Sequence, residues 1–173
     1  MASRFVKMTI NEFEEDKKSL GERSWTVESA IRNEYRTDPL KEWALFSLAG
    51  YINGCRSSMK QNAIHFEFVH SFIAFSGRDF TERGVFTTQT EYEQMGLDRT
   101  SEYFDALRDG DAEQKIKAVA RKFLINVGCN PNDITTHMVA VSSFVNASIY
   151  TKKMFDDLQK SYRLISDSEK GKH

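Results

Sequence analysis

Proline occurs only twice in this chain of 173 residues. Because proline breaks a helix from within, its scarcity allows long helices along most of the chain. Apolar residues recur at helical spacing; over 112–127, for example, Ile116, Val119 and Phe123 share one face. No alternation of the βαβ type is visible. The sequence therefore predicts an all-α fold, an irregular helical bundle or array of six to eight helices.

Residues that favour helix N-caps mark the expected helix starts. They are Thr9, Thr26, Asp38, Thr100, Asp111, Asp133 and Thr151. The helix over 40–52, after Asp38-Pro39, is apolar almost all round, so it is predicted to be the central buried helix. In the helix that follows Asp133, five apolar residues at helical spacing are expected to face the core. They are Ile134, Met138, Val141, Val145 and Ile149.

Two segments are harder to assign. Over 64–75 some apolar residues alternate as in a strand and others have helical spacing, and the length of the segment favours a helix. Residues 77–97 hold three of the nine glycines together with several β-favouring residues. This segment is predicted to be a long loop, with a short β-hairpin as the alternative.

Composition indicates one ordinary globular domain, with 40% hydrophobic and 28% charged residues. We expect a single α-helical domain over 1–165 and a frayed polar tail over 166–173. No apolar stretch approaches the length of a membrane span, so no membrane association is expected. Cys55 and Cys129 are predicted to be reduced thiols, which favours a cytoplasmic or nuclear protein.

Sequence motifs of familiar enzymes are missing, including the nucleophile elbow, the phosphate loop and the dinucleotide fingerprint. Glu67 and His70 have the i, i+3 spacing of a ligand pair in carboxylate-bridged di-iron bundles. No second Glu-x-x-His accompanies them. An enzyme is therefore not favoured, and no cofactor or metal is expected, although Glu67 and His70 keep a metal-dependent helical-bundle enzyme as a third hypothesis.

Charge is unevenly distributed although the formal net charge is −1. Residues 78–111 hold nine acids and four bases, whereas residues 112–163 hold eight bases and four acids. The predicted basic faces contain Lys115, Lys117, Arg121 and Lys122 on one helix and Lys152, Lys153, Lys160 and Arg163 on the last helix. The predicted acidic patch contains Asp98, Glu102, Asp105 and Asp109.

Two leading hypotheses follow from this charge pattern. The first is a non-enzymatic assembly or binding protein that acts through self-association or a protein partner, with acidic and basic patches joining head to tail. Many viral and phage structural proteins share this combination of features. The second is an RNA- or DNA-binding protein whose basic faces neutralise phosphates. The plain alternative to both is that these residues form solvated helix surfaces.

Overall fold

The structure of the protein is a computed structural model that describes residues 1–20, 38–58 and 63–161. These residues form six helices: α1 (Ala2–Leu20), α3 (Pro39–Ser58), α4 (Ala63–Glu82), α5 (Gln89–Ala106), α6 (Ala112–Asn126) and α7 (Ile134–Ser161). No strand occurs in this part of the chain. The all-α prediction is confirmed. The helix expected after Thr26 lies outside the described residues.

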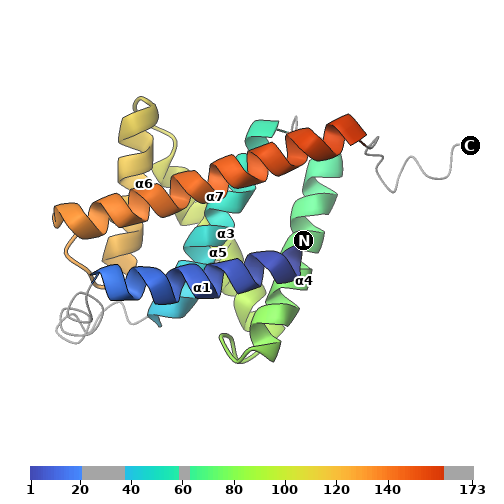
Figure 1. Cartoon of the computed structure of the whole chain (residues 1–173), viewed down its shortest axis with the longest axis horizontal. Helices are drawn as coiled ribbons and strands as arrows, with labels where there is room; N and C mark the ends of the chain where they lie inside the picture. Colours follow the sequence, from blue (N-terminus) through green and yellow to red (C-terminus); the bar gives the residue numbers. More distant parts are fainter. Residues whose placement is uncertain (21–37, 59–62, 162–173) are drawn as a thin grey trace, which may run out of the picture.

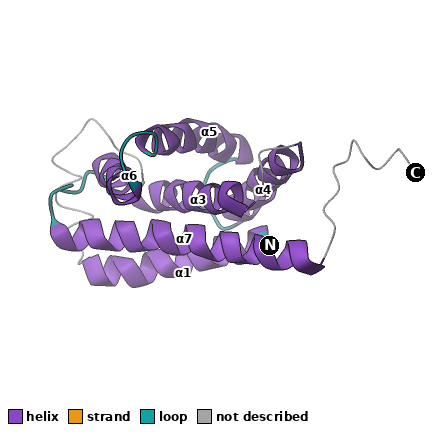
Figure 2. Ribbon diagram, turned by 90° about the horizontal axis from the view of Figure 1, so that it is seen from above, coloured by secondary structure: helices purple, strands orange, loops and turns teal. Residues whose placement is uncertain are grey.

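Helix α3 lies at the centre of the molecule (Figure 1). In Figure 2, α1 and α7 lie side by side below it, α5 lies above it, and α6 and α4 flank its two ends. α1 and α7 run in opposite directions (Figure 1). α3 packs against all five of the other described helices and most extensively against α7. The central, buried position predicted for the 40–52 helix is therefore confirmed.

The close approach of α3 to α7 depends on two glycines. A Cβ atom on Gly54 would lie 2.2 Å from the Ser148 carbonyl oxygen, and one on Gly50 would lie 2.9 Å from Cβ of Ala147. Ser148 Oγ also donates a hydrogen bond to the Gly50 carbonyl oxygen at 3.1 Å. Glycine costs a helix about 1 kcal/mol relative to alanine. Here the two glycines allow the backbones of α3 and α7 to come into contact.

Aromatic side chains dominate the core on both sides of α3. The rings of Trp43 and Phe123 lie 5.6 Å apart in an edge-to-face arrangement, and Phe46 stacks on Phe123 at 4.4 Å. A second buried cluster joins α1, α3, α4 and α5. Its buried aromatic residues are Phe5, Tyr51, Phe72, Phe80, Phe86 and Tyr92.

Three of the predicted helix starts are confirmed by their hydrogen bonds. Asp38 Oδ1 accepts from the backbone N–H of Leu40 at 2.9 Å. Asp111 forms a full capping box at the start of α6. Asp133 Oδ1 accepts from the backbone N–H of Thr136 at 2.8 Å, at the start of α7. Each cap satisfies a backbone N–H that the first helical turn leaves without a partner.

The caps predicted at Thr9, Thr100 and Thr151 are wrong. All three residues are buried within longer helices. Thr100 Oγ1 donates to the Gly96 carbonyl oxygen at 2.5 Å, and Thr151 Oγ1 donates to that of Ala147 at 2.8 Å. A threonine that donates to the preceding turn satisfies its own hydroxyl, so it fits the interior of a helix as well as its end.

The long loop or hairpin predicted over 77–97 is also wrong. α4 runs to Glu82 and α5 begins at Gln89, which leaves a connection of only residues 83–88. Gly77 lies inside α4, where a Cβ atom would come within 2.7 Å of the Tyr92 ring. Of the glycines in this segment, Gly84 supplies the turn, with φ of 72°. In this segment Gly77 therefore serves close helix packing, and Gly84 serves chain reversal.

The predicted core face of α7 is wrong for most of its residues. Ile134, Met138 and Ile149 are exposed and Val145 is only partly buried, whereas Val141 is partly buried and packs against the core. The face that packs on α3 instead carries small residues and two phenylalanines. Its buried members are Thr136, Ala140, Phe144, Thr151 and Phe155. Where this face meets Gly50 and Gly54 of α3, it carries the small residues Ala147, Ser148 and Thr151, which fit close to the α3 backbone.

Candidate interaction surfaces

The four basic residues predicted on α6 lie off its buried face, which contains Val119, Ala120, Phe123 and Leu124. Lys117 pairs with Glu113 on the same helix, with 2.5 Å between Nζ and Oε1. Lys122 reaches α5, where its Nζ lies 3.2 Å from Oε2 of Glu102. Lys115 is half-buried and Arg121 is exposed. Two of the four cations therefore have a carboxylate of the same chain beside them.

The predicted acidic residues lie on α5 and in the turn after it. Asp98 and Asp105 are exposed on α5, and Asp109 is exposed in the turn. Glu102 accepts a hydrogen bond from Arg99 at 2.9 Å in addition to its contact with Lys122. Burial opposes ionisation of Glu102, but the Lys122 hydrogen bond and the Arg99 charge outweigh it and lower its pKa. The acidic and basic sets thus meet within one molecule.

The second basic set lies near the end of α7. Lys152 pairs with Asp156 at 2.7 Å, and Lys160 pairs with Asp157 at 3.1 Å. The hydrogen bond from Lys152, together with one from Ser58, lowers the pKa of Asp156. Lys153 is exposed. Arg163 lies outside the described residues.

A buried polar network joins α3, α5 and α6. Glu42 is fully buried and accepts hydrogen bonds from Arg99 Nε at 3.0 Å, from Asn126 Nδ2 at 3.2 Å and from the Tyr103 hydroxyl. Arg99 continues from this network to Glu102. Burial, followed by the neighbouring Glu42 charge, raises the pKa of Tyr103 well above its ordinary value. Donors thus surround the Glu42 carboxylate, and the network holds α5 and α6 against α3.

An exposed apolar stripe lies on α7. We define the outer face of α7 as Ile134, Met138, Val141, Val145 and Ile149. The exposed fractions of Ile134, Met138 and Ile149 are 79%, 57% and 60%. The residues have the spacing of a helical stripe that borders the packed face formed by Ala140 and Phe144, and its central residue Val141 packs against the core. Sequence reasoning identified these residues as a set but placed them in the core.

The outer face also lies in the longest uncharged run of the sequence. Residues 134–151, 18 in number, contain no Asp, Glu, Lys or Arg. The next longest run, residues 43–55, belongs to the buried helix α3. Helix surfaces that face water are ordinarily rich in charge. An uncharged run in an exposed helix is therefore the sequence signal that could have identified this surface.

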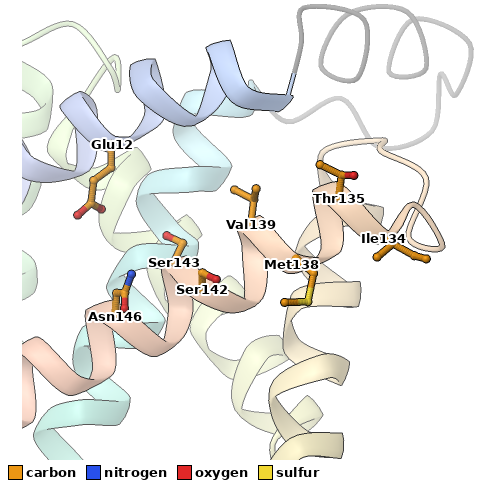
Figure 3. A pocket seen from close by; sticks show the side chains of 8 residues that line it. All are labelled: Glu12, Ile134, Thr135, Met138, Val139, Ser142, Ser143 and Asn146. Atoms are coloured by element: carbon orange, nitrogen blue, oxygen red, sulfur yellow. The ribbon is translucent and has the colours of Figure 1, made fainter.

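A groove of about 550 Å³ borders the outer face on the side of α1. Figure 3 shows Ile134, Met138 and Ser142 along α7, with Glu12 of α1 pointing toward Ser143 and Asn146. The groove thus continues the apolar stripe into a polar margin. Such a combination of apolar centre and polar rim is typical of surfaces that bind another protein.

The described residues add no support for the candidate metal and thiol sites. Glu67 and His70 lie on α4, and no cluster of three or more metal-ligating side chains occurs among the described residues. Cys55 and Cys129 are buried and form no disulfide, and burial raises the pKa of Cys55 to about 12. Such a thiol stays protonated and unreactive at neutral pH. None of the described helices is sufficiently long and apolar to cross a bilayer.

No family model, curated protein or solved structure matches this chain. The chemistry of its own surfaces is therefore the basis for assigning a function.

Proposed function

We propose that this protein is a non-enzymatic assembly protein that self-associates through the outer face of α7. The observation that supports this most strongly is the exposure of Ile134, Met138 and Ile149 within an 18-residue uncharged run. The central part of a protein interface is depleted in charge and enriched in large apolar residues, methionine among them. Contiguous apolar surface on a folded chain marks an interaction site.

The same surface carries opposite charges at its two ends. Asp133 precedes the uncharged run and Lys153 follows it, exposed, while the neighbouring Lys152 already pairs with Asp156. A surface with one sign of charge at each end is complementary to an inverted copy of itself. This favours a second copy of the chain over an unrelated protein as the partner.

Nucleic-acid binding is the less supported hypothesis. Phosphate neutralisation needs cations that are available to the ligand. Of the seven predicted basic residues within the described part of the chain, four lie within 3.2 Å of a carboxylate. They are Lys117, Lys122, Lys152 and Lys160. The outer face of α7 offers no cation at all.

The test compares two double variants by sedimentation over a range of concentrations. Met138→Glu with Ile149→Glu places two charges on the outer face and is expected to convert the oligomer into a monomer. Phe75→Glu with Leu97→Glu is the matched control, because these residues are similarly exposed, at 56% and 60%, on α4 and α5. The control is expected to associate as the wild type does. Circular dichroism checks that both variants stay helical.

A wild-type chain that is monomeric at every concentration would contradict the proposed function. So would equal association of the two double variants. Retention of the monomer on single-stranded RNA, lost when Lys115, Lys117, Arg121 and Lys122 are changed to Glu, would replace it with the nucleic-acid hypothesis.

A further inference from the structure

The residue pattern of the outer face of α7 is nearly symmetric about a point between Val141 and Ser142. Ile134 and Ile149 lie at equal distances from that point along the helix, and so do Met138 and Val145. The pattern therefore places isoleucine against isoleucine, and methionine against valine, when the helix is inverted upon itself. An unrelated partner would not require this symmetry.

A two-fold axis through that point would pair α7 with an antiparallel copy. An isologous contact of this kind uses the same patch twice, so every residue must suit its own counterpart. The large apolar residues satisfy this condition on both sides of the axis. At the axis, Ser142 lies against Val141, and the small serine allows the two helices to approach closely.

Electrostatics favours the antiparallel orientation over the parallel one. In the antiparallel pair, Asp133 of one copy lies at the same end as the exposed Lys153 of the other, whereas Lys152 pairs with Asp156 of its own helix. In a parallel pair, like charges lie at the same end. The two helix dipoles also oppose each other in the antiparallel pair, which places opposite partial charges side by side.

We infer that the protein forms a closed antiparallel dimer through α7, an inference that rests on the proposed function. Ile134 of each copy lies opposite Ile149 of the other, and Met138 lies opposite Val145. In an isologous contact each chain buries its patch against the same patch of the other, so no copy of the surface stays open and assembly through it stops at the dimer. This differs from the head-to-tail contact of acidic and basic patches, which would build rings or filaments.

The dimer is expected to be weak. One helix from each chain contributes fewer residues than the roughly 20–30 per side of a standard interface. Dissociation is therefore expected on the order of micromolar concentrations, and experiments should extend from about 1 to about 500 µM. Association would be missed at the concentrations used in routine gel filtration.

Disulfide trapping in the full chain tests the orientation and the register. The single variants Met138→Cys and Val145→Cys are oxidised separately and as an equimolar mixture. The antiparallel dimer is expected to give a disulfide between residues 138 and 145 only in the mixture. Two copies of residue 138 lie about 10 Å apart along the helix axis, which is too far for a disulfide. Ile134→Cys mixed with Ile149→Cys repeats the test at the ends of the stripe.

The parent chain is the control, because its native thiols Cys55 and Cys129 are buried and should not cross-link. Disulfides within each single variant and none preferred in the mixture would show a parallel pair. That outcome overturns the inference while leaving the proposed function intact. Absence of any cross-link in a chain that sediments as a dimer would overturn it equally. A wild-type monomer insensitive to the outer-face variants contradicts the proposed function itself.

Discussion

Glu42 is the residue whose environment most constrains this molecule. It is charged and fully buried in the central helix, and its partners come from two other helices. A buried carboxylate is tolerated only when donors compensate for its lost hydration. Arg99, Tyr103 and Asn126 supply them here. Glu42 thus fixes the positions of α5 and α6 relative to α3.

Replacing Arg99 with methionine should be strongly destabilising. The substitution keeps much of the side-chain volume but leaves the Glu42 carboxylate without its cation. Removing one partner of a buried ion pair costs about 3–5 kcal/mol. Arg108→Met is the control, since Arg108 pairs with Asp105 at 2.9 Å on the open surface. It should cost less than about 1 kcal/mol. Urea unfolding measures both, and equal losses would contradict a special role for Arg99.

Residues that act locally were predictable from sequence, and residues that act at a distance were not. Asp38, Asp111 and Asp133 cap helices within three residues of themselves, so the sequence contains the whole interaction. The partners of Glu42 lie 57 to 84 residues away along the chain. Nothing in the local sequence distinguishes Glu42 from an exposed glutamate.

At the scale of helices, α7 shows how periodicity can identify a stripe and misplace it. The helix has two apolar faces, one with Ile134, Met138 and Ile149 and one with Ala140 and Phe144. The bulkier face resembles a core when α7 is considered alone. The packed face is the one whose small residues Ala147, Ser148 and Thr151 meet the glycines of α3. That information belongs to the pair of helices and is absent from either sequence segment alone.

Gly54→Ala should destabilise the protein although alanine favours helices. The added Cβ would lie 2.2 Å from the Ser148 carbonyl oxygen, so α3 and α7 must separate. Overpacking of this kind costs about 1–3 kcal/mol. Gly96→Ala is the matched control, because its Cβ would lie 3.5 Å from Cδ2 of Leu48, an ordinary van der Waals distance. It should be neutral or stabilise by up to about 1 kcal/mol. Thermal unfolding distinguishes the two, and a stabilising Gly54→Ala would contradict the close packing.

On the scale of the whole molecule, the charges of α5 and α6 partly compensate each other, whereas the outer face of α7 carries none. The acidic and basic residues of α5 and α6 meet through Glu102 and Lys122, so part of the apparent charge polarity is neutralised within the chain. The outer face of α7 stays uncharged. Charge counting along the sequence showed the polarity but could not show this internal pairing, which depends on how two helices pack.

Salt should therefore leave the proposed dimer nearly unchanged. Raising the ionic strength from about 0.05 to about 0.5 M screens exposed charges but barely affects apolar burial. The dissociation constant measured by sedimentation should change less than about threefold. A head-to-tail contact between charged patches, or binding to RNA, should weaken much more steeply. A steep loss of self-association with salt would favour the charged patches as the interface.

The buried network also bears on the order in which this chain can become stable during synthesis. Helix α3 emerges from the ribosome long before Arg99, Tyr103 and Asn126, the last of which follows Glu42 by 84 residues. Until all three residues are available, the central buried helix of the protein contains a carboxylate that lacks its full set of donors. A nascent chain should therefore keep α3 open to solvent, and to chaperones, until α6 has been made. Stalled chains ending before and after α6 should differ sharply in their resistance to protease.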